Sequence, residues 1–70
     1  MQRQLVSSST LREVGYDAAA ATLEIMFKSG AVYQYYRVPS EVHIKLIAAG
    51  SLGAYFNTYI KGRYGDTRVG

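Results

Sequence analysis

The chain has 70 residues, a net charge of +3 and a pI near 9.4, with 49% apolar and 19% charged residues. This length supports one domain spanning residues 1–70, and the composition is that of a globular chain rather than a disordered one. Without cysteine and with a single histidine, His43, disulfides and thiolate metal sites are excluded, so we expect no metal and no cofactor. No signal-peptide pattern and no apolar run of transmembrane length occurs, so we expect a cytoplasmic protein that does not bind membranes.

The first predicted strand, Leu11–Tyr16, follows a polar run at residues 7–10 that suits an entry loop or a sheet edge. Leu11 and Val14 have opposite parity, so one of them is misphased on a regular strand unless a bulge intervenes. Gly15 is the residue at which we expect the bend.

The second predicted strand, Thr22–Lys28, alternates cleanly, with Leu23, Ile25 and Phe27 on one face. A three-residue turn, Lys28–Gly30, pairs Phe27 with Ala31 and leads into a third, tyrosine-rich strand. We favour this turn over a two-residue turn because it keeps Gln34 out of the core.

Pro39 ends the third strand, and two short helices follow, the first over Ser40–Ala49 with Gly50 after it. Ser51 is the expected cap of the second helix, which ends near Gly62. The predicted fold is therefore α+β, a three-stranded antiparallel β-meander followed by two short α-helices packed on one face. Residues 63–70 are either an ordered tail or a frayed one.

The same residues resemble the KTSC domain, named after the C-terminal segment of some lysyl-tRNA synthetases and also found as a small bacterial or phage protein. The resemblance is carried by Ser8-Ser9, Gly15-Tyr16-Asp17, Leu23, Phe27, Gly30, Tyr33-x-Tyr35, Val38-Pro39, Ala49-Gly50-Ser51, Gly53, Tyr55-Phe56-Asn57, Ile60 and Lys61-Gly62-Arg63-Tyr64. It implies RNA binding by association with the synthetase and implies no established reaction. The chain departs from the family at Leu52 and Ala54, where basic residues are common.

Tyr33 and Tyr35 suit either base stacking or the core, and the register favours a core covered by the helices. The predicted binding residues are therefore Tyr36 on the open sheet face and the basic and aromatic residues Arg37, Lys61, Arg63, Tyr64 and Arg68. Ser8 and Ser9 offer hydroxyl and backbone donors to an anion. For Asn57 we prefer a role in fixing its helix over base reading.

The leading hypothesis is a non-enzymatic module that binds RNA or a nucleotide-like anionic small molecule, because His43 has no acid or nucleophile partner at a useful spacing. The alternative is a self-associating phage or accessory protein that sequesters a nucleotide messenger or binds a partner protein. Leu52, Ala54 and Met26 would then form the contact of a homo-oligomer. A third hypothesis is that the protein is an appended fragment that helps a larger assembly to fold or dock and has no ligand of its own.

Overall fold

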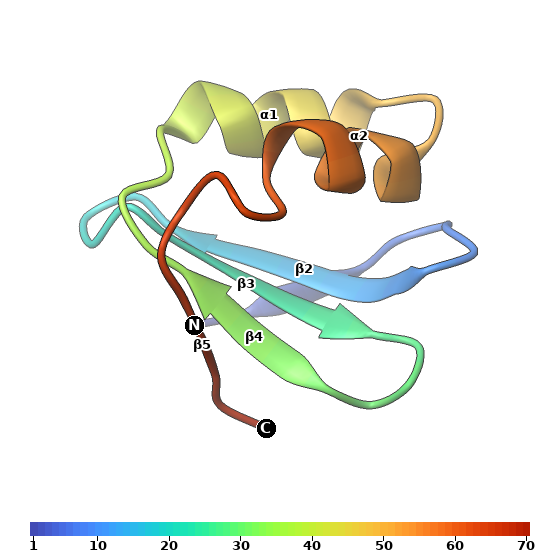
Figure 1. The fold of residues 1–70 in the computed structure, drawn as a ribbon, viewed down its shortest axis with the longest axis horizontal. Coiled ribbons are helices and arrows are strands. Elements are labelled where there is room, and N and C mark those ends of the chain that lie inside the picture. The colour runs from blue at the N-terminus through green and yellow to red at the C-terminus, as the bar shows by residue number, and fades with distance from the viewer.

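The computed structural model describes residues 1–70 as a five-stranded antiparallel sheet with two helices over one face (Figure 1). The strands are β1 (Arg3–Leu5), β2 (Leu11–Asp17), β3 (Thr22–Phe27), β4 (Val32–Tyr35) and β5 (Asp66–Arg68), in that order across the sheet. The helices are α1 (Ser40–Ala48) and α2 (Leu52–Tyr59). The α+β class and the two helices are confirmed, but the prediction of three strands is wrong, because β1 and β5 extend the meander at both edges.

The turn between β3 and β4 has the three-residue form expected from the sequence. The N–H of Phe27 donates to Ala31 O at 2.9 Å, and the N–H of Gly30 donates to Phe27 O at 2.9 Å. Gly30 has a φ of 96°, the left-handed conformation that glycine adopts without strain. Leu23 consequently pairs with Tyr35 and Ile25 with Tyr33, on the face that carries the helices.

The bulge in β2 lies at a different residue from the one predicted. The register shifts between Leu11 and Glu13, and this extra residue turns both Leu11 and Val14 into the core. Gly15 pairs regularly with Arg3 and Glu24, so the expectation of a bend at Gly15 is wrong. Glycine is needed there for another reason: a Cβ at this position would lie 2.5 Å from the carbonyl oxygen of Gln2.

A Gly15→Ala variant is therefore expected to displace β1 and to lower the free energy of unfolding by about 1–3 kcal/mol, the usual cost of overpacking. The matched control is Gly50→Ala, because a Cβ at Gly50 meets nothing within 4 Å and its φ is not positive. Urea unfolding compares the two. Equal unfolding midpoints for both variants would show that β1 shifts to admit the added methyl group without loss of stability.

β1 and β5 have only three residues each, and their sequences carry no alternation that identifies them as strands. β5 pairs with β4 through Tyr33–Arg68, Gln34–Thr67 and Tyr35–Asp66. The C-terminal residues are thus an ordered strand, and the alternative of a frayed tail is wrong.

The face of the sheet opposite the helices carries a polar network around Glu24, whose exposed fraction is 7%. Arg3 Nε donates to Glu13 Oε1 at 2.8 Å, and Arg3 Nη1 donates to Glu24 Oε2. Gln34 Nε2 donates to Glu24 Oε1 at 2.9 Å. Burial by itself would raise the pKa of Glu24, but the hydrogen bonds from Gln34 and Arg3 hold it below its ordinary value of 4.5. The ionised Glu24 therefore ties β1 and β4 to β3.

The core lies between the sheet and the helices, where Leu46 of α1 and Phe56 of α2 cover Leu23 and Ile25. Ser51 Oγ accepts from the N–H of Ala54 at 3.2 Å, so Ser51 is the cap of α2 as predicted. Gly62, with a φ of 73°, follows the end of α2. Gly50 directly follows Ala49, the C-cap of α1, which is the place predicted for it. Neither helix is long and apolar enough to cross a membrane.

Candidate ligand-binding cleft

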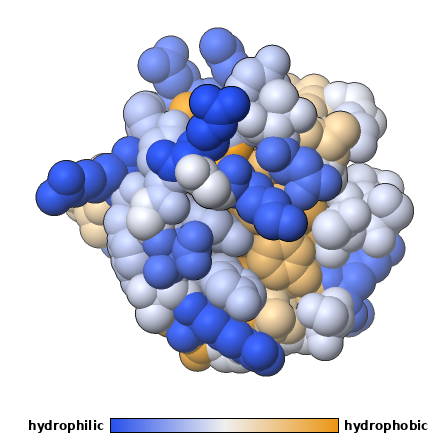
Figure 2. Space-filling view, viewed as in Figure 1, coloured by the Kyte–Doolittle hydropathy of each residue, from blue (hydrophilic) through white to orange (hydrophobic).

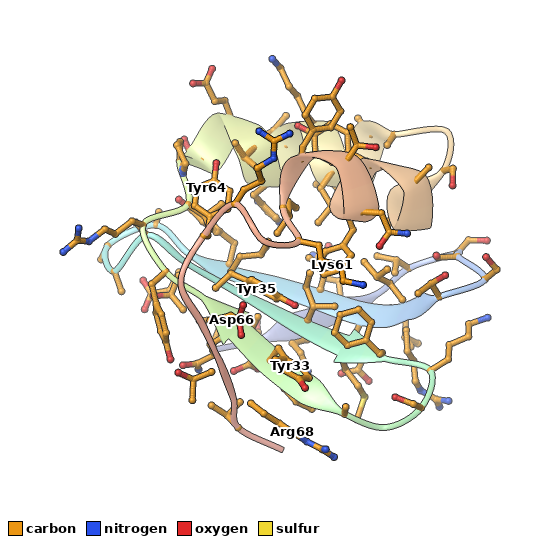
Figure 3. All side chains as sticks on the ribbon, viewed as in Figure 1. Tyr33, Tyr35, Lys61, Tyr64, Asp66 and Arg68 are labelled. Carbon is orange, nitrogen blue, oxygen red and sulfur yellow. The ribbon has the colours of Figure 1, made fainter.

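A cleft of about 370 Å³ opens on the helix-bearing side of the sheet, between the end of α2 and strand β4. It is lined by Thr10, Phe27, Tyr33, Tyr35, Phe56, Asn57, Lys61 and Asp66. Figure 2 shows an apolar surface in the middle of this view, bordered by hydrophilic side chains, and Figure 3 shows Lys61, Tyr35, Asp66 and Tyr33 around the opening. From the sequence we expected the helices to cover this part of the sheet, but they leave it open.

Four aromatic rings form the apolar part of the cleft. Phe27 and Tyr33 meet edge to face, with centroids 5.9 Å apart, and Phe56 contacts Phe27 at 5.3 Å and Tyr35 at 5.5 Å in the same manner. Tyr33 and Tyr35 lie next to each other at 6.4 Å, with 28° between their planes. Tyr35 and Phe56 are buried, whereas Tyr33 and Phe27 are half-buried. The cleft thus presents ring surface on a floor that the core holds in place.

The pairing of β5 with β4 brings charge to this aromatic surface. Because directly paired residues point to the same face of a sheet, Asp66 shares a face with Tyr35 and Arg68 with Tyr33. The chain reaches β5 directly from the end of α2, where Lys61 lies over the same cleft (Figure 3). An exposed ammonium group and an exposed carboxylate therefore border the rings.

The polar side chains of the cleft have unused hydrogen-bonding capacity. Both ion pairs of the protein belong to Arg3, so Lys61 and Asp66 form none. None of the thirteen hydrogen bonds that involve side chains uses the side chain of Asn57, Lys61 or Asp66, or the hydroxyl of Tyr33 or Tyr35. Free donors and acceptors around apolar rings are what a small-ligand site requires.

Tyr35 keeps its proton in this environment. Burial, with smaller contributions from Asp66 and Tyr33, raises the pKa of Tyr35 to about 12. No buried side-chain oxygen or nitrogen lacks a partner, so the unbonded hydroxyl of Tyr35 reaches the open space of the cleft. It is a neutral group that can donate or accept.

The residues predicted to bind a ligand do not form one site. Lys61 lines the cleft. Arg68 pairs with Tyr33 but is not among the lining residues, and its Nε donates to Gly70 O at 2.8 Å. Tyr36 continues β4 towards the opposite face of the sheet, and its hydroxyl lies 3.5 Å from Gln34 Oε1. Tyr36 and Lys61 therefore cannot contact the same nucleotide.

The other predicted residues are spread more widely. Tyr64 packs against the core at a distance from Lys61 (Figure 3), while Arg37 and Arg63 are exposed. Ser8 Oγ accepts from the N–H groups of Thr10 and Leu11 at 3.1 and 3.2 Å, so this hydroxyl closes a turn. Ser8 and Ser9 line a separate open hollow between residues 5–9 and the start of α2.

Asp66 was not among the predicted site residues, while Tyr33 and Asn57 were considered for ligand contact and then assigned to structural roles. The expectation that the helices cover both Tyr33 and Tyr35 is wrong for Tyr33, which is half-buried and open to the cleft. The side chain of Asn57 is exposed and takes part in none of the side-chain hydrogen bonds, so the role of fixing its helix is wrong too. Only the pairing of β5 with β4 would have brought Asp66 to Tyr35, and no pattern in the sequence indicates that strand.

The apolar contact predicted for a homo-oligomer is not one surface. Leu52 is 7% exposed and belongs to the core, and Met26 lies on the opposite face of the sheet from Ala54 of α2. The outer apolar side chains of the helices are instead Ile44, Ile47 and Tyr59. Self-association stays a prediction.

Comparison with known proteins places the chain in a family. The family model of the KTSC domain matches residues 7–64. The chain belongs to the KTSC family. The resemblance seen in the sequence is thus confirmed, and the matched residues include every element from β2 to α2 together with Lys61 and Tyr64.

Relatives of this KTSC domain occur alone and inside larger proteins. A protein of Stutzerimonas stutzeri is 48% identical over 87% of this chain and 86% of its own length. A lysine–tRNA ligase of Nostoc punctiforme is 41% identical over 80% of this chain, a segment that makes up 10% of the ligase. The crystal structure of a KTSC domain protein from Yersinia pestis matches with a TM-score of 0.96 and 40% identity, covering 99% of this chain and 97% of that one. The fold is therefore shared closely with a solved member.

Proposed function

We propose that this KTSC domain is a non-catalytic module that binds single-stranded RNA, with one unpaired nucleotide held in the aromatic cleft. The observation that carries the proposal is the half-buried ring of Tyr33 beside Lys61, in a cleft where the charged side chains form no ion pair. The occurrence of a related segment in a lysine–tRNA ligase supports RNA as the partner. No residue of the cleft is arranged as a nucleophile with an adjacent base.

The size of the cleft favours one nucleotide. Its volume of about 370 Å³ is near the lower end of the roughly 300–1,000 Å³ typical of small-ligand pockets. A base stacked on Tyr33 gains about 1–3 kcal/mol in single-strand binding proteins. Lys61 supplies the charge that a neighbouring phosphate requires. The net charge of +3 favours the approach of RNA without holding it at a particular place.

The first experiment measures the binding of a fluorescein-labelled, unstructured RNA of about eight nucleotides, within the range of site sizes of small single-strand binding folds. Fluorescence anisotropy is recorded between low and physiological salt. We expect affinity that falls with salt, because phosphate contacts release counterions. No affinity at low salt, or affinity that salt leaves unchanged, contradicts the proposal.

A Tyr33→Leu variant tests the stacking surface. We expect a loss of about 1–3 kcal/mol in binding free energy, since leucine keeps the apolar contact with the core but offers no ring face. Tyr59→Leu is the matched control, because Tyr59 is exposed on α2 outside the cleft and should bind as the parent does. Thermal melts confirm that both variants are folded. Equal losses in the two variants would place binding elsewhere.

A Lys61→Gln variant tests the phosphate contact. Removing one phosphate contact on a single strand should make the slope of log K against log salt shallower by about 0.7. Lys45→Gln on α1 makes the same change of charge away from the cleft. Identical slopes for Lys61→Gln and Lys45→Gln would leave only a general charge effect and exclude a specific contact at Lys61.

A further inference from the structure

The negatively charged carboxylate of Asp66 would repel an RNA phosphate, so it is not explained by a contact with the RNA backbone. It lines the cleft with Lys61 and the rings of Tyr33 and Tyr35, it is exposed, and it forms no ion pair. β5 fixes its position through the pairing of Asp66 with Tyr35. An unpaired acceptor beside a stacking surface is suited to the N–H groups of a base rather than to the backbone.

We propose that the cleft prefers guanine over the other bases, with Asp66 accepting hydrogen bonds from its N1–H and N2–H groups. This inference rests on the proposed binding of single-stranded RNA and adds the identity of the base. Guanine alone among the four presents two adjacent N–H donors on its Watson–Crick edge, which match the two oxygens of one carboxylate. Charge-assisted bidentate contacts of this kind are the strong ones.

Lys61 would make the second contact that distinguishes guanine from the other bases. Guanine carries acceptors at O6 and N7, and an ammonium group is a donor with three N–H bonds. Adenine would instead turn its N1 lone pair towards the carboxylate of Asp66 and its amino group towards Lys61. Cytosine and uracil each present one donor to the carboxylate, and their smaller rings cover less of Tyr33. The charges of the cleft therefore oppose adenine and only partly satisfy the pyrimidines.

The test uses the full chain and a short uridine RNA whose central position is guanine, inosine, adenine, cytosine or uracil, with anisotropy as the readout. We expect guanine to bind about tenfold more tightly than adenine, within the discrimination that one bidentate contact provides. Inosine lacks the N2 amino group and should lie between them. Equal affinities for all five RNAs would overturn the guanine preference while leaving RNA binding intact. Failure of every RNA to bind would instead overturn the proposed function.

An Asp66→Asn variant separates base reading from charge. Asparagine offers one acceptor and one donor, so the preference for guanine over adenine should fall to about twofold or less, since the remaining contact is not bidentate. Glu41→Gln on α1 makes the same change of net charge away from the cleft and should keep the tenfold preference. A guanine preference that survives Asp66→Asn unchanged would overturn the role of Asp66. Because the series of five RNAs uses the unaltered protein, that test does not depend on the folding of any variant.

Discussion

Replacing Leu46 by alanine is expected to lower the free energy of unfolding by about 2–5 kcal/mol, the range for leucine-to-alanine changes in a core. Leu46 is fully buried, and it is the residue through which α1 enters the core. A domain of 70 residues has a total stability of only about 4–10 kcal/mol, so this single change removes a large share of it. The melting temperature should fall by about 10 °C or more, since about 1 kcal/mol shifts it by 4–8 °C at this size.

Ile44→Ala is the control on the same helix, because Ile44 is 58% exposed. Its effect should stay within about 0.5 kcal/mol, as for other surface positions. Urea and thermal unfolding of the two variants give the comparison. A loss in Ile44→Ala as large as that in Leu46→Ala would mean that the outer face of α1 is buried in solution, as in a self-associated protein.

Replacing Arg3 by methionine should cost about 1–3 kcal/mol at neutral pH, the usual cost of removing a hydrogen-bond donor from a buried acceptor. The change leaves the buried carboxylate of Glu24 with Gln34 as its one remaining side-chain donor. Arg12→Met is the matched control on β2, since Arg12 is exposed and forms no ion pair. The control should change stability by no more than about 0.5 kcal/mol.

The cost of Arg3→Met depends on pH in a defined direction. The pKa of Glu24 is lower in the folded protein than its ordinary 4.5, so the stabilisation it provides is present above pH 4.5 and is lost as pH falls through the folded value. A protonated Glu24 does not need Arg3. The difference in stability between parent and variant should therefore be largest at pH 7 and shrink towards pH 3. An equal difference at both pH values would show that Arg3 stabilises the fold by packing alone.

Much of the fold was predictable from the sequence because its signals are local. Alternation over residues 22–28 and the position of Gly30 were sufficient to set the register of the β3–β4 hairpin. Pro39 and Ser51 marked the starts of the helices for equally local reasons. The bulge was recognised as necessary but placed at Gly15, since parity shows that a residue is extra without showing which one.

The features that were not predicted from the sequence are those that depend on contacts between residues far apart in the chain. Three-residue strands have no period of their own, and β5 is a strand only because β4 offers it an edge. The cleft depends on that pairing. Lys61 could be proposed as a binding residue from its charge alone, whereas Asp66 and Tyr33 were not assigned to a site. The gap left above Tyr33 depends on where the helices lie over the sheet, which no residue pattern specifies.

The short strand β5 also has a consequence for the behaviour of the protein in concentrated solution. Residues 31–36 form a run without charge, proline or glycine that contains one valine and three tyrosines. Such runs assemble into cross-β aggregates when their backbone edge is free. β5 occupies that edge of β4 and presents Asp66 and Arg68 beside it, a combination that blunts edge-to-edge assembly. The strand that completes the cleft is thus also the gatekeeper of the segment most prone to aggregate.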